Sequence, residues 1–140
     1  MKLRHFTLSS LLFLAFLAFS FAEEAKFVVG EPLPDPDAGY TIERMGKEGF
    51  LNLQLIERRF HLFFLDADDN LMEPDKAFAT IRTQSFSNED EFFRLSRNED
   101  PVCLRSPRFV AKPYIFGIFL SVFNPDEEDT KETYNFKYSE

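Results

Sequence analysis

The sequence predicts an all-β fold, an antiparallel, immunoglobulin-like β-sandwich of seven to eight strands. From residue 40 onward, short segments rich in Phe, Leu, Ile and Tyr are separated by polar turn residues about every 8–12 positions. Several segments alternate apolar and polar side chains, as half-buried strands do. No segment of ten or more residues shows the 3.6-residue spacing of a helix. A small β-barrel is the alternative arrangement of the same strands.

The strands are expected in the following order. Residues 40–45 and 50–56 form the first pair, joined by the turn Gly46-Lys47-Glu48-Gly49. Residues 59–65 are almost continuously apolar, which is typical of a central strand covered on both faces. A helical turn at residues 87–91 is considered because capping and acidic residues begin it. The remaining strands are expected at 77–83, 92–95, 102–105, 114–123 and 134–138.

The N-terminus has the features of a secretory signal peptide. A short basic segment at residues 2–5 precedes an apolar run, and residues 20–22 place small side chains where a signal peptidase cleaves. We expect cleavage after Ala22 and export to a periplasmic or extracellular location. An uncleaved anchor is the alternative, since residues 6–22 have the minimum length of a membrane span. Two glutamates, rather than a basic stop-transfer flank, follow the run and favour cleavage.

After cleavage the chain would consist of a Pro-rich extended arm, residues 23–39, and one domain, residues 40–140. Alternating prolines at 32, 34 and 36 disfavour regular pairing in the arm. The mature chain has 14 basic and 24 acidic side chains, a net charge of −10. Such a surface repels nucleic-acid phosphates and anionic lipid headgroups. We expect no nucleic-acid partner and no stable membrane insertion after cleavage.

Cys103 is the single cysteine, so no intrachain disulfide can form, and we expect this thiol to be buried in a strand. Stability must then come from an apolar core, to which fourteen phenylalanines of the mature chain are available. Cys103 and His61 are the only conceivable nucleophile and base, but their local sequences lack features that activate a thiol. No serine-hydrolase, phosphate-loop or zinc-protease motif is present, and we expect a protein that is not an enzyme and needs no cofactor.

The segment from Asp66 to Glu73 is the candidate metal site. Asp66, Asp68 and Asn70 have the alternating spacing of a calcium loop. An EF-hand is excluded because Leu71 occupies the required glycine position and Ala77 the position of the bidentate glutamate. A looser calcium site remains one interpretation. The other is a plain strand-to-strand turn, where Asp and Asn side chains commonly accept hydrogen bonds from local amides.

A candidate binding surface lies along the aromatic strand at residues 114–123, represented by Tyr114 and Phe116. Tyrosines on a sheet can stack against ligands, although alternating placement also suits core packing and cross-strand pairs. Paired carboxylates acting as a hydrolase are the remaining enzymatic alternative. That alternative requires a concave pocket that holds two acids with perturbed pKa values.

The run FHLFFLDADDNLMEPDKAFATIRT resembles a hairpin of small bacterial exported immunoglobulin-like domains, including uncharacterised envelope proteins and the FixH and YtkA-like kind. The stretch VCLRSPRFVAKPYIFGIFLSVF is similar to their final hairpin. This chain has Asn70 where those domains usually carry glycine. The resemblance implies a sandwich fold and the envelope compartment. We therefore expect an exported, non-catalytic binding or accessory module whose partner is an envelope or secreted protein, with a calcium- or ligand-dependent binding protein as the alternative.

Overall fold

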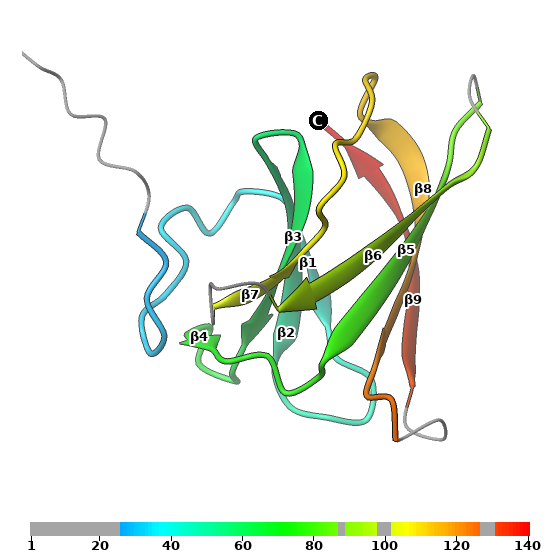
Figure 1. Ribbon diagram of the computed structural model, residues 1–140. Helices are drawn as coiled ribbons and strands as arrows, with labels where there is room; N and C mark the ends of the chain where they lie inside the picture. The colour runs from blue at the N-terminus through cyan, green and yellow to red at the C-terminus, as the bar shows by residue number, and fades with distance from the viewer. Residues whose placement is uncertain (1–25, 87–88, 98–101, 127–130) are drawn as a thin grey trace, which may run out of the picture.

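The computed structural model describes residues 26–86, 89–97, 102–126 and 131–140 (Figure 1). Over these residues the regular structure is entirely β, so the described part contains no helix long and apolar enough to cross a membrane. The strands are β1 (Tyr40–Glu43), β2 (Phe50–Ile56), β3 (Arg59–Leu65), β4 (Leu71–Met72), β5 (Phe78–Gln84), β6 (Glu91–Arg97), β7 (Cys103–Arg105), β8 (Ile115–Phe123) and β9 (Glu132–Ser139).

The strands form one antiparallel sheet in the order β1-β2-β3-β7-β6-β5-β8-β9, and β4 pairs separately with β3. The sheet bends over itself, so that β1, β2 and β3 form one layer and β5, β8 and β9 the other (Figure 1). The described strands β1 and β9 end the order and share no backbone ladder. The prediction of an all-β antiparallel fold is confirmed. The nearly closed sheet agrees with both a sandwich and a small barrel.

The expected strands all occur, with boundaries shifted by a few residues at most. The strand β4 was not expected, because two residues are too few to show an alternating pattern. It pairs with β3 through Phe64 opposite Met72 and Leu65 opposite Leu71. Glu91 begins β6 rather than ending a helical turn, and residues 87–88 of that expected turn lie outside the described residues.

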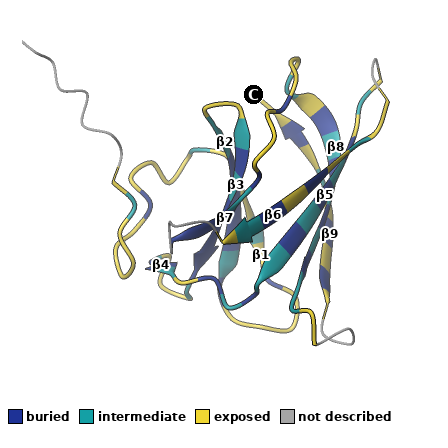
Figure 2. Ribbon diagram, viewed as in Figure 1, coloured by how far each residue is buried: buried dark blue, intermediate teal, exposed yellow. Residues whose placement is uncertain are grey.

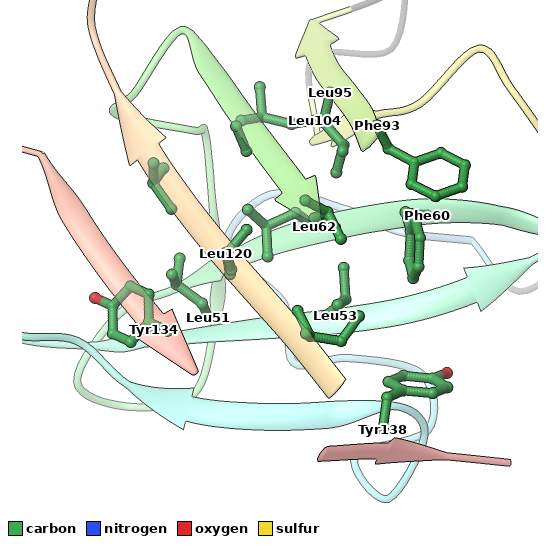
Figure 3. Packing of buried hydrophobic residues seen from close by; sticks show 14 of the residues in the cluster. Leu51, Leu53, Phe60, Leu62, Phe93, Leu95, Leu104, Leu120, Tyr134 and Tyr138 are labelled. Carbon is green, nitrogen blue, oxygen red and sulfur yellow. The ribbon is translucent and has the colours of Figure 1, made fainter. Parts of the chain in front are cut away.

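Alternation of side chains along the strands builds the main core (Figure 2). Leu51 and Leu53 of β2 are fully buried, and so are Phe60 and Leu62 of β3. Side chains from the opposite layer close over them, among them Leu120, Tyr134 and Tyr138 in Figure 3. A fully buried Leu or Phe contributes about 1.5–3 kcal/mol of transfer free energy, so this core stabilises a domain that has no disulfide.

The N-terminal arm covers a second, smaller core on the outside of the first layer (Figure 1). The Phe27 ring stacks on Phe63 with a centroid separation of 4.4 Å. The Gly30 amide donates to the Leu71 carbonyl at 2.7 Å, and the Leu71 amide donates to the Glu31 carbonyl at 2.8 Å. The arm is thus attached by the Phe27 ring and by backbone hydrogen bonds at residues 30 and 31, and no strand forms at residues 26–29.

Two turns depend on backbone with positive φ. Ile56 pairs with Arg59, so Glu57 and Arg58 are the two loop residues of the β2–β3 hairpin, with φ of 50° and 65°. Positive φ at both positions is the type I′ geometry that normally selects Asn and Gly. At Gly49 φ is 104°, and an added Cβ would lie 2.2 Å from the Leu65 carbonyl oxygen, so that position requires glycine.

Candidate functional site

The acidic turn after β3 uses its first carboxylate to hold its own backbone. Asp66 Oδ1 accepts hydrogen bonds from the Asp68 amide at 2.9 Å and from the Asn70 amide at 3.0 Å. Asp69 completes the turn with φ of 63°. In the described residues, no group of three or more His, Cys, Asp or Glu side chains is arranged to hold a metal ion. The turn interpretation explains this geometry, and calcium binding by Asp66, Asp68 and Asn70 stays a prediction.

The two residues predicted for a binding surface occupy different environments. Phe116 is 5% exposed and lies in the main core, stacked on Tyr138 at 5.7 Å and edge-on to Phe60 at 6.0 Å. Tyr114 is half-buried, with Lys112 Nζ 5.7 Å from its ring centroid. The outward surface of β8 is therefore formed by the residues that alternate with Phe116.

His61 and Cys103 are brought together, with Cys103 Sγ 3.7 Å from His61 Nδ1 across β3 and β7. The thiol is 3% exposed and belongs to the second core beneath the N-terminal arm. Burial of Cys103 was expected, whereas its proximity to His61 depends on the β3–β7 pairing. The pair has the contact needed for nucleophilic chemistry, but the sulfur has almost no surface that a substrate can reach.

Arg44, at the end of β1, forms a buried ion-pair network with two carboxylates. Its Nε and Nη2 donate to Glu132 Oε1 and Oε2 at 3.0 and 2.6 Å, and its Nη1 donates to Asp75 Oδ2 at 2.8 Å. The Arg44 side chain has no exposed surface, and its guanidinium lies 5.3 Å from the Phe64 ring centroid. Lys47 also pairs with Asp75, and the Tyr134 hydroxyl donates to Glu132 Oε1 at 2.9 Å.

The electrostatics of this network oppose acid catalysis. Burial alone would raise the pKa of Asp75, but hydrogen bonds from Arg44 and Lys47 lower that pKa below its ordinary value. Burial likewise disfavours the charged form of Arg44, yet its bonds to Glu132 and Asp75 raise the pKa of Arg44. A carboxyl group held ionised in this way is a poor proton donor. The network therefore has the properties of a structural clamp.

A further surface, which we call the outer face, covers the second layer on the side away from the main core. The neighbouring residues on β5, β6, β8 and β9 are buried, so the alternate side chains point outward. The outer face consists of these sixteen residues, matched across the strands by their pairing: Phe92, Arg94 and Ser96 of β6; Phe78, Thr80, Arg82 and Gln84 of β5; Ile115, Gly117, Phe119, Ser121 and Phe123 of β8; Thr133, Asn135, Lys137 and Ser139 of β9.

The composition of the outer face differs from that of the whole chain. The chain has 24 acidic and 16 basic side chains, yet the sixteen outer-face residues include three cations and no carboxylate. Five of the sixteen are large apolar residues, four of them phenylalanines. Phe92 is 67% exposed and Ile115 50% exposed. Aromatic and arginine side chains are the types that protein interfaces favour.

Both arginines of the outer face are held against its aromatic rings. The Arg82 guanidinium lies 4.3 Å from the Phe119 ring centroid, and the Arg94 guanidinium lies 4.4 Å from that of Phe78. Such cation–π stacking fixes long side chains before a partner arrives and so reduces the entropy lost on binding. Arg82 Nε also lies 3.9 Å from Asp90 Oδ2, a carboxylate just outside the face.

A pocket of about 580 Å³ opens at one end of the outer face. Its lining includes Phe86, Ile115, Gly117 and Lys137, and the Phe86 side chain is fully exposed. Gly117 lacks a side chain between Gln84 and Lys137, which leaves this row of the face shallow. The site thus combines flat aromatic surface, fixed cations and a hollow suited to an apolar side chain.

The sequence contained a signal for the outer face. Residues 115–123 carry apolar side chains at both alternating sets of positions, which means that a strand with one face in the core also places Phe119 and Phe123 outside. Which strands lie beside it, and hence which arginines stack on those rings, depends on sheet order.

Comparison of the chain with family models, with curated proteins and with solved structures gave no match.

Proposed function

We propose that this protein is an exported, non-catalytic binding module of the cell envelope that acts through the outer face. One observation carries the proposal: in a chain with a net charge of −8, four neighbouring strands present two exposed apolar side chains, three half-buried phenylalanines and two stacked arginines, with no carboxylate among the outer-face residues. An exposed apolar patch of this kind is costly to maintain in water and is typical of an interaction site.

The other features of the chain support the same proposal. The N-terminal segment has the pattern of a cleaved signal peptide, which would deliver the domain to the periplasm or the exterior. The Arg44 network holds its carboxylates by ion pairs, and Cys103 is almost inaccessible. These properties favour binding over catalysis, and an accessory role within an envelope assembly suits a small acidic domain.

The proposal is tested by site-specific cross-linking in the producing cells. A photo-reactive amino acid replaces Phe92 in one variant and Arg58 in the control, because Arg58 is exposed on the β2–β3 turn. We expect a discrete cross-linked product from position 92 and none from position 58. Equal products from both positions, or none from either, would contradict the proposal. N-terminal sequencing of the exported protein checks cleavage, with Glu23 as the expected first residue.

A further inference from the structure

The residues of the outer face form rows that run across the strands. Phe78 and Phe123 lie opposite each other in one row, and the next row on the same face holds Arg94. The third row sets Arg82 between Phe92 and Phe119 on the two adjoining strands. The fourth row holds Gln84, Gly117 and Lys137. Aromatic and cationic side chains are thus interleaved on the face, since Arg82 shares a row with two phenylalanines and the Arg94 guanidinium stacks on Phe78.

Successive rows are two residues apart, which corresponds to about 6.6 Å along a strand. An extended peptide has the same repeat between side chains on one of its faces. A partner strand lying on the outer face would therefore meet aromatic rings and cations with successive side chains of one of its faces. A matching segment therefore carries both apolar and acidic side chains on that face.

We infer that the partner of the outer face is an acidic protein segment in extended conformation that carries apolar and acidic side chains on the same face. This inference rests on the proposed function and adds the chemistry of the partner. Its carboxylates pair with cations of the face, first of all Arg82 and Arg94, which lie on the neighbouring strands β5 and β6. Its apolar side chains pack on the phenylalanine rings, and one of them enters the pocket beside Phe86.

A second copy of this chain is a poorer occupant. A two-fold symmetric contact through the outer face would bring Arg82, Arg94 and Lys137 of both copies into one interface, with no carboxylate of the face to pair with them. Single-stranded nucleic acid also stacks on aromatic residues beside arginines. The net charge of −8 opposes its approach, whereas a peptide with a few carboxylates interacts mainly with nearby side chains.

The test uses the purified protein and three fluorescent twelve-residue peptides made of three repeats: Leu-Thr-Glu-Thr, Leu-Thr-Gln-Thr and Leu-Thr-Lys-Thr. Binding is measured by fluorescence anisotropy at low and high salt. The R82E/R94E variant reverses two cations of the outer face. The matched control, R58E/K112E, makes the same change in net charge and also removes two cations stacked on rings, those of Phe109 and Tyr114. Circular dichroism verifies that both variants are folded.

We expect the glutamate peptide to bind most tightly, and R82E/R94E to weaken that binding at least about tenfold while R58E/K112E changes it less than about twofold. Added salt should weaken the binding. Equal losses in both variants, or equal binding of the lysine peptide, would overturn the inference. Tighter binding of oligothymidylate, or a dimer in sedimentation that R82E/R94E dissociates, would also overturn it. If position 92 still cross-links while the glutamate peptide fails, the partner chemistry is wrong and the proposed function stands.

Discussion

Substitution of Arg44 by alanine should destabilise the fold more than a typical surface mutation. The guanidinium is buried and neutralises Glu132, whose side chain is 9% exposed, and Asp75, whose side chain is 21% exposed. Its removal leaves two carboxylates close to each other with only Lys47 still paired to one of them. Breaking a buried ion pair from one side costs about 3–5 kcal/mol, because the remaining charge is desolvated without compensation.

Urea unfolding followed by circular dichroism measures this loss directly as a change in the free energy of unfolding. We expect R44A to lose about 3–5 kcal/mol, equivalent to a fall in Tm of about 10–20 °C for a domain of this size. The double variant R44M/E132L should lose less than R44A, since it removes charge from both sides of the pair. A loss below about 1 kcal/mol for R44A would refute the interpretation of the network as a structural clamp.

Three other measurements follow from the structure. Replacing Glu57 and Arg58 by Asn-Gly should raise the free energy of unfolding by about 1 kcal/mol in urea titrations, because both positions have positive φ; a loss of stability would contradict the type I′ assignment. The pKa of Asp75 is lowered in the folded state, so its contribution is complete above its ordinary pKa of 3.8 and disappears as pH falls through the folded value. Asp75→Asn should therefore make the free energy of unfolding less dependent on pH below about pH 4. An unchanged dependence on pH would contradict this. Millimolar calcium should leave the Tm unchanged if Asp66 only holds its turn, whereas a rise of several degrees that Asp66→Ala abolishes would establish the metal site.

The strands could be predicted because they depend on local patterns. Alternating leucines in residues 51–55 and the apolar run at 59–65 specify which side chains enter the core, whichever strands lie next to them. The same rule explains why the sequence left both a binding surface and core packing open for Phe116: the alternation identifies two faces but does not say which of them is outside. The structure shows which face is buried, since Leu120, on the same face of β8 as Phe116, also lies in the core.

The candidate site could not be predicted because its contacts join distant segments. Arg44 reaches Glu132 across 88 residues, and the closeness of His61 to Cys103 depends on the pairing of β3 with β7. The stacks of Arg82 on Phe119 and Arg94 on Phe78 likewise depend on the β6-β5-β8 order. The β2–β3 turn was missed for a different reason, since Glu57 and Arg58 lack the Asn-Gly signature of its conformation.

The way the sheet closes has a consequence for solubility. Between β1 and β9 there is no backbone ladder, and the gap is bridged by the Arg44–Glu132 pair, the Tyr40–Phe136 stack at 4.6 Å and the bond from the Met45 amide to the Tyr134 hydroxyl at 3.0 Å. The edge of β9 that faces β1 is therefore a strand edge of eight residues that pairs with no described strand, and these side chains lie across it. Such an edge is a template on which another chain can add a strand. We therefore expect loss of the Arg44 clamp to expose this edge, so that R44A aggregates faster than the unaltered protein.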